Sequence, residues 1–291
     1  MIDAHHHVWD LSVRDQDWIT GPELAPLRRD FGIDDLPAAA NGVTATVLVQ
    51  TVAVAGETPE FLALAERHDL IAAVVGWTDL TAPSVADDLA ALRAAPGGRR
   101  LRGIRHQVQG EADPRWLCRD DVRAGLRAVG EEGLVYELLT LPHQLPAAIE
   151  TVSALPGTAF VLDHCSKPPI ASGALEPWAG LVRELAARPN VTCKLSGLVT
   201  EADWEKWTVE DLRPYAEVVL EAFGPGRVMF GSDWPVCLLA APYETVLESA
   251  RALTGGLSAG ERREVFGGVA ARVYGIARPP RAATGRPGPS A

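Results

Sequence analysis

The sequence predicts a closed (β/α)8 barrel, an α/β fold built around eight parallel strands. Apolar, β-branched runs alternate with stretches of helical periodicity along most of the chain, and strictly alternating strands and helices form parallel sheets that are covered on both faces. The length of 291 residues suits a barrel of eight such units. A doubly wound open sheet is the alternative. Its dinucleotide-binding form is disfavoured because no G-x-G-x-x-G follows the first strand.

The first strand is expected within residues 1–9, which contain three consecutive histidines. An affinity tag is the alternative interpretation, but a tag is normally a longer run, and here Ile2 and Asp3 precede the histidines. Side chains alternate along an extended strand, so Asp3, His5 and His7 are expected to share one face. Such an H-x-H pair suits the binding of a divalent cation or the polarisation of a carbonyl oxygen.

The next segment, residues 10–35, lacks a clean period and is predicted to be a long loop with room for one short helix, and such loops are usually functional. The remaining strands are expected at 45–51, 71–77, 101–108, 134–140, 158–164, 191–197 and 227–233. Helices are expected at 59–70, 83–95, 120–129, 144–154, 178–187, 209–223 and 243–253.

A final helix is predicted to begin at the capping box formed by Ser258 and Glu261. It would carry Val265, Phe266, Val269 and Val273 on one apolar stripe. We therefore expect one barrel domain over residues 1–277. Residues 278–291 are rich in Pro and Gly without apolar periodicity, and we predict that they are disordered.

Composition narrows the classes of partner. The formal net charge of −11 and pI of about 5.1 leave no basic field for nucleic acid or an anionic membrane. No apolar run approaches the roughly 18 residues of a spanning helix, and the N-terminus lacks the pattern of a signal peptide. The four cysteines show no C-x-x-C spacing, which favours a reduced cytoplasm. A homo-oligomer is compatible with the sequence.

Polar residues gather where the predicted strands end, which is the catalytic end of such a barrel. Ionisable residues are rare in buried parallel strands unless they are paired or functional. In strand order, the residues are His5 and His7, Gln50, Trp77, Arg105 and His106, Glu137, His164 with Lys167, Lys194, and Asp233.

Several of these residues also have a structural interpretation. Arg105 and Glu137 could form an ion pair inside the barrel, and Lys194 could neutralise a carboxylate there. Only one of Arg105 and His106 can face inward, because neighbours in a strand alternate. A lone histidine such as His106 is commonly a satisfied core or loop group. The same interpretation applies to His143, and Cys165, Cys193 and Cys237 are best taken as small apolar fillers.

Five motifs resemble those of the amidohydrolase-related proteins of the amidohydrolase superfamily. Within this group the similarity is to the branch of sugar lactonases that includes the L-fuconolactonases and L-rhamnono-lactonases. The resemblance covers nearly the whole chain up to about Ile276. The motifs are Asp3-Ala-His-His-His-Val-Trp-Asp10, Leu27-Arg-Arg-Asp-Phe31, Leu162-Asp-His-Cys-Ser-Lys-Pro168, Cys193-Lys-Leu-Ser-Gly197 and Gly231-Ser-Asp-Trp-Pro-Val236.

This resemblance implies a (β/α)8 barrel with functional groups at His5, His7, His164 and Asp233. Superfamily members with two metal ions have a carboxylated lysine or a glutamate after strand four, where this chain offers Arg105, and a histidine after strand five. The expectation is therefore either one divalent cation, zinc or manganese, held by His5, His7 and Asp233, or no metal at all.

The function implied is a hydrolase that opens a small lactone, with a sugar lactone as the expected substrate and Asp233 as the general base. His5, His7 and His164 would orient the carbonyl group and the water or bind the metal. Arg105 and Lys167 would bind substrate hydroxyls or a carboxylate. The other substrate-binding candidates are Gln50 and the rings of Trp9, Trp77 and Trp234. The alternatives are a metal-dependent decarboxylase or other hydrolase of the superfamily, and a non-catalytic binding protein.

Overall fold

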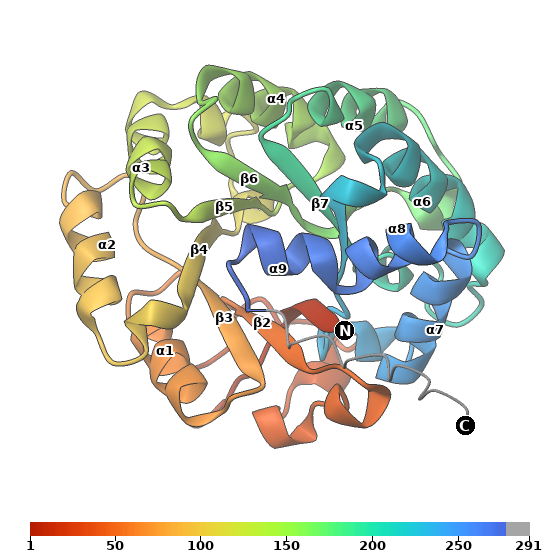
Figure 1. The fold of residues 1–291 in the computed structure, drawn as a ribbon, viewed down its shortest axis with the longest axis horizontal. Helices are drawn as coiled ribbons and strands as arrows, with labels where there is room; N and C mark the ends of the chain where they lie inside the picture. Colours follow the sequence, from red (N-terminus) through yellow and green to blue (C-terminus); the bar gives the residue numbers. More distant parts are fainter. Residues whose placement is uncertain (278–291) are drawn as a thin grey trace, which may run out of the picture.

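The computed structural model describes residues 1–277, and in it eight parallel strands follow one another in chain order around a barrel (Figure 1). The predicted (β/α)8 barrel is confirmed. The tail predicted at residues 278–291 lies outside the described residues. The strands are β1 (Ile2–His6), β2 (Ala45–Val49), β3 (Ile71–Gly76), β4 (Leu101–His106), β5 (Val135–Leu138), β6 (Ala159–Leu162), β7 (Val191–Leu195) and β8 (Val228–Phe230).

Helices surround the strands on the outside of the barrel (Figure 1). They are α1 (Glu57–Arg67), α2 (Val85–Ala94), α3 (Asp120–Glu131), α4 (Leu145–Ala154), α5 (Trp178–Ala186), α6 (Val209–Phe223) and α7 (Tyr243–Leu253). Residues 10–35 contain only two short 3-10 turns, which agrees with the predicted loop. None of the helices within residues 1–277 combines the length and the apolar character that crossing a bilayer requires.

The last two helices, α8 (Ala259–Arg263) and α9 (Val269–Val273), cover the end of the barrel at which the strands begin (Figure 1). The capping box is confirmed, because the Ser258 side chain accepts a hydrogen bond from the Glu261 backbone N–H. The single continuous helix predicted here is wrong. A π-helical turn over Glu264–Gly268 separates the two helices. Two adjacent glycines in this turn lower the cost of bending the helix.

Backbone hydrogen bonds between the ends of β1 and β8 complete the barrel. The Asp233 N–H donates to the His5 carbonyl at 2.8 Å, and the His7 N–H donates to the Trp234 carbonyl at 2.7 Å. The Asp3 carboxylate accepts from the Ser232 N–H at 2.8 Å. The seam that closes the fold is thus made by the same residues that the motifs mark as functional.

The pairing of β1 with β2 shifts register between Asp3 and His6. The expectation that Asp3 shares a face with His5 and His7 is therefore wrong. Asp3 accepts a hydrogen bond from the Tyr243 hydroxyl of α7, outside the sheet, whereas His5 contacts Lys194 inside the barrel. A bulge of this kind locally breaks the alternation of side chains along a strand.

The barrel interior contains an apolar layer and, above it, a layer of four buried charged residues. The charged layer consists of Arg105, Glu137, Asp163 and Lys194, each at most 2% exposed. The ammonium group of Lys194 lies 2.6 Å from Glu137 and 3.2 Å from Asp163, and Arg105 lies 3.1 Å from Asp163. The apolar layer below includes Val47, Ala73, Val75, Val135, Val161 and Met229.

This arrangement settles how the inward-facing charges pair. Lys194 neutralises carboxylates, as one interpretation of the sequence proposed, but Arg105 pairs with Asp163 rather than with Glu137. Burial and the nearby Asp163 raise the pKa of Glu137, while Lys194 opposes that effect. Glu137 also accepts a hydrogen bond from the Tyr274 hydroxyl, which follows α9. The C-terminal helix is therefore tied to the centre of the barrel.

Replacement of Lys194 by methionine should destabilise the protein strongly. The change keeps an apolar chain of similar length but leaves Glu137 and Asp163 without their shared cation, and breaking a buried ion pair costs about 3–5 kcal/mol. Urea unfolding followed by circular dichroism measures the loss. Lys206→Met, at an exposed lysine, is the matched control and should change the free energy of unfolding by less than about 0.5 kcal/mol. Equal stabilities of the two variants would contradict this account of the barrel centre.

Candidate active site

A cavity of about 230 Å³ opens at the end of the barrel where the strands finish. Its wall combines apolar side chains with a few polar and charged groups, which is the usual composition of a small-molecule site. The lining residues are His7, Trp18, Leu24, Thr51, Arg105, Gln107, Gln109, Leu139, His164, Lys167, Thr200, Glu201, Trp204, Asp233, Val236 and Leu239.

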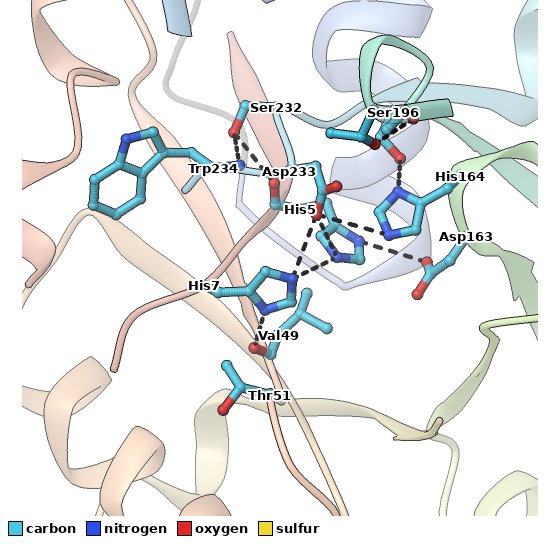
Figure 2. Close-up of polar contacts among 12 residues, drawn as sticks. His5, His7, Val49, Thr51, Asp163, His164, Ser196, Ser232, Asp233 and Trp234 are labelled. Atoms are coloured by element: carbon cyan, nitrogen blue, oxygen red, sulfur yellow. Dashed lines mark hydrogen bonds and ion pairs between the residues drawn. The ribbon is translucent and has the colours of Figure 1, made fainter. Parts of the chain in front are cut away.

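Three histidines and one aspartate converge at the base of this cavity (Figure 2). The Oδ1 atom of Asp233 lies 3.5 Å from His7 Nε2, 3.7 Å from His5 Nε2 and 3.8 Å from His164 Nε2. The Nε2 atoms of His5 and His7 are 3.1 Å apart. The structure therefore brings together all four residues that the strand ends and the motifs indicated.

Hydrogen bonds at the far side of two rings fix how these histidines point. His7 Nδ1 lies 2.7 Å from the Val49 carbonyl oxygen, which can only accept, so this nitrogen carries the proton and Nε2 keeps its lone pair. His164 Nδ1 lies 2.9 Å from the Ser196 hydroxyl. Burial lowers the pKa of His7 and lowers that of His164 to about 4. Both rings are neutral at pH 7.

Asp233 is ionised despite its burial. Burial alone would raise its pKa, but His164, His7 and Lys167 outweigh this effect and hold the pKa below the ordinary value of an aspartate. The residue has φ 58°, in the left-handed region that non-glycine residues seldom adopt. Backbone strain of this kind is concentrated at functional sites, and here it lies three residues after the end of β8.

His164 also depends on an unusual backbone. Four consecutive residues, His164 to Lys167, have φ between 49° and 57°, and a left-handed conformation costs about 1–2 kcal/mol for each non-glycine residue. Two bonds hold this turn: the Trp178 indole N–H donates to the Cys165 carbonyl at 2.8 Å, and the Ser166 hydroxyl donates to the Thr140 carbonyl at 3.1 Å. The surrounding structure thus maintains a turn that the chain would not adopt by itself.

His5 links this cluster to the buried charges below it. Its Nδ1 atom lies 3.1 Å from the Lys194 ammonium group, and its Nε2 atom lies 3.2 Å from Arg105. Burial and Lys194 lower the pKa of His5 well below its ordinary value. The ring is therefore neutral, and its single acceptor nitrogen can accept a hydrogen bond from one of these two cationic groups.

The cluster has the donor types of a site for one divalent cation. One ligand atom each from His5, His164 and Asp233 lie within 4.8 Å of one another, and His7 Nε2 is 3.1 Å from His5 Nε2. Neutral imidazoles with an ionised carboxylate are donors that zinc favours. The residues present therefore fit such an ion.

A second group of potential ligands, His5, Glu137 and Asp163, lies deeper in the barrel. The ammonium group of Lys194 already lies 3.2 Å or less from an atom of each of these residues. A second metal ion would have to displace this internal cation. His143 is exposed and is not among the residues that line the cavity. The geometry therefore favours one cation over two.

The predicted substrate-binding residues divide into two sets. Arg105 and Lys167 line the cavity. Gln50 is fully buried and accepts from Arg105 at 2.9 Å, so it contacts the cavity only through that residue. Trp9, Trp77 and Trp234 do not line it.

The three tryptophans have partners elsewhere in the protein. The Trp9 ring packs edge-on against Trp18 and Phe31. The Trp77 indole donates to His106 at 3.0 Å, and His106 faces away from the barrel centre. The Trp234 ring is directed away from the cluster (Figure 2) and is 2% exposed.

The sequence did not indicate several residues that build the site. Asp163 precedes His164 within the motif at residues 162–168, but strict alternation would send these neighbours to opposite faces. Because β6 ends at Leu162, the left-handed turn directs both of them to the centre. Trp18, Glu201 and Trp204 lie on loops, where no periodicity marks an inward direction, and they too line the cavity.

The chain is similar to known proteins in sequence and in fold. The family model described as Amidohydrolase matches residues 2–276. The chain is 43% identical to an L-fucono-1,5-lactonase of Burkholderia multivorans, over 96% of this chain and 97% of the relative. It is 38% identical to an L-fucono-1,5-lactonase of Burkholderia ambifaria, over 96% of each chain. A crystal structure of an amidohydrolase from Burkholderia multivorans with bound zinc has a TM-score of 0.90 at 41% identity, over 95% of this chain and 99% of that one.

Glycine at position 197 should be required for the placement of His164. Gly197 has φ +64°, and a Cβ atom there would lie 2.7 Å from His164 Nδ1. Gly173 has φ +69°, and a Cβ atom added there would have no atom within 4 Å. Gly173→Ala therefore measures the backbone strain alone, which should cost about 1–2 kcal/mol. Gly197→Ala should cost about 1–3 kcal/mol more through overpacking. The free energies of unfolding in urea give the comparison, and equal losses would show that His164 is not confined by this contact.

Proposed function

The chain belongs to the amidohydrolase family, and from that premise we propose that it is a hydrolase that opens a sugar lactone by adding water to the ring ester. The observation that carries the proposal is the ionised Asp233 at the base of a cavity, with neutral His7 and His164 beside it. An ionised carboxylate held among neutral imidazoles can accept a proton from water at pH 7. The two similar lactonases support the substrate class.

In the proposed reaction, Asp233 holds a water molecule against one face of the lactone carbonyl. The water oxygen bonds to the carbonyl carbon while one of its protons moves to Asp233. The ring C–O bond then breaks, and the proton passes from Asp233 to the departing ring oxygen, which becomes a hydroxyl. The product is an open-chain hydroxy acid, which ionises at neutral pH and releases one proton to solution.

Charged and polar groups beside Asp233 would stabilise the oxyanion that forms during the attack. Arg105 lines the cavity next to His5, and its guanidinium group offers several hydrogen-bond donors. The His7 Nε2 atom keeps its lone pair and suits a cation or a proton of the attacking water. The His164 Nδ1 atom can accept from the Ser196 hydroxyl, and in that tautomer its Nε2–H would donate to the oxyanion. Preorganised dipoles of this kind are commonly the largest contribution to catalysis.

We further propose that the cluster holds one divalent cation, zinc or manganese. His5, His7 and Asp233 would hold it, with His164 as a further donor, and the zinc-bound structure of a similar protein supports this assignment. When bound, such an ion polarises a carbonyl oxygen and lowers the pKa of water. With or without this ion, the Asp233 carboxylate would accept the proton of the water and return it to the ring oxygen.

Asp233→Asn should lower kcat by at least about 10³-fold while the fold is retained, because the amide cannot accept the proton. Turnover of a panel of aldonolactones, followed by proton release with a pH indicator, measures the change, and circular dichroism checks the fold. Asp69→Asn, at an exposed aspartate, is the control and should keep full activity. Retained turnover in Asp233→Asn would contradict the assignment of Asp233 as the general base.

Calorimetric titration of the chelator-treated protein with zinc should give one ion bound per chain. His7→Asn should weaken this binding at least tenfold, because it removes one imidazole donor. His143→Asn, at an exposed histidine outside the cavity, should leave it unchanged. Two ions per chain, or equal affinities in the two variants, would contradict the proposed site.

A further inference from the structure

Two side chains of opposite charge meet in the wall of the cavity, away from the His/Asp cluster. Lys167 follows β6 and Glu201 follows β7, and their Nζ and Oε1 atoms are 3.0 Å apart. Both residues line the cavity. Their side chains are 25% and 22% exposed, so a ligand in the cavity can reach them.

Away from the His/Asp cluster, where the proposed oxyanion and divalent cation would lie, the described part of the wall offers no unpaired side-chain cation to a ligand carboxylate. Within residues 1–277 the cavity is lined by two cationic residues, Arg105 and Lys167, and two carboxylates, Glu201 and Asp233. Arg105 already contacts Gln50 at 2.9 Å and Asp163 at 3.1 Å, and Lys167 is paired with Glu201. A carboxylate on a substrate would meet two like charges, and it would have to displace a protein carboxylate to gain a partner.

We propose that Glu201 is a specificity-determining residue that excludes carboxylate-bearing lactones by neutralising Lys167. This inference rests on the proposed lactone hydrolysis and defines its substrate class as uncharged polyhydroxy lactones. Uncharged polar side chains in the wall keep capacity for hydroxyl groups. The Gln109 amide oxygen has no hydrogen-bond partner within residues 1–277, and Gln107 uses its amide nitrogen to donate to the Thr51 carbonyl at 2.9 Å. Selectivity here comes from an arrangement that disfavours the wrong ligand as much as from contacts that favour the right one.

The role of Glu201 differs from that of a general structural ion pair. A partly exposed pair contributes little to stability, so its loss should leave the fold intact. Removing the charge of Glu201 alone leaves Lys167 with an unpaired ammonium group in the cavity wall. That group could then bind a substrate carboxylate, which adds a favourable interaction where the wild type has a repulsive one.

The test compares two lactones that differ at one carbon, galactono-1,4-lactone and galactaro-1,4-lactone, in which a carboxylate replaces the CH2OH group. The kcat/KM of each is measured for the wild type, Glu201→Gln and Glu205→Gln. Glu205 is exposed on the same segment and does not line the cavity. The ratio of the anionic to the neutral substrate should rise about tenfold or more in Glu201→Gln and stay at the wild-type value in Glu205→Gln. Effects common to both substrates cancel in this ratio.

The outcomes separate this inference from the proposed function. If the wild type opens the neutral lactone and the ratio is the same in Glu201→Gln, the role of Glu201 is overturned and the lactonase proposal stands. A wild type that opens both lactones equally well also overturns it. If no protein opens either lactone, the proposed function fails. In that case, the rise in melting temperature caused by each lactone is compared between the wild type and Glu201→Gln. If the ratio of the rise with the anionic lactone to the rise with the neutral lactone is the same in both proteins, the role of Glu201 is overturned.

Discussion

Two cations and two carboxylates share the centre of this barrel, and the site above them depends on their pairing. Water is excluded there, so each charge needs a partner of opposite sign within hydrogen-bonding distance. Lys194 and Arg105 meet that need for Glu137 and Asp163, and both cations also reach the ring of His5. The same contacts that neutralise the core therefore determine where one of the site's imidazoles lies. Stability and site geometry have a common origin in this protein.

The remaining site residues are placed by backbone conformation rather than by side-chain packing alone. The hydrogen bonds that join β1 to β8 run between residues 5, 7, 233 and 234, so the H-x-H pair and Asp233 are fixed by closure of the barrel. His164 is directed inward by a left-handed turn that its surroundings hold in place. Asp233 shares this conformation. Within the described residues, the non-glycine residues with left-handed backbone are His164 to Lys167 and Asp233, so this strain lies on the turns that carry two of the site's side chains.

Much of the fold and the His/Asp set could be predicted from the sequence, because both depend on patterns that repeat along the chain. Strand and helix periods alternate throughout, and strand ends define one face of a barrel. What could not be predicted depends on departures from those periods. The bulge in β1 moved Asp3 to the outer face, the turn after β6 brought Asp163 inward, and two glycines divided the last helix. The rings of Trp9 and Trp234 pack away from the cavity. Their direction could not be predicted, because side chains on loops follow no period.

The balance of charge in the barrel centre also constrains how such a sequence can change over generations. Replacing any one of Arg105, Glu137, Asp163 or Lys194 by an uncharged residue leaves an odd charge in a dry interior, whereas removing one cation together with one carboxylate does not. Single substitutions at these four positions are therefore costly, and the positions are expected to change together. The pair formed by Lys167 and Glu201 is partly exposed, so the loss of one member costs much less than the loss of a buried charge. Substrate preference can diverge there while the barrel centre stays fixed.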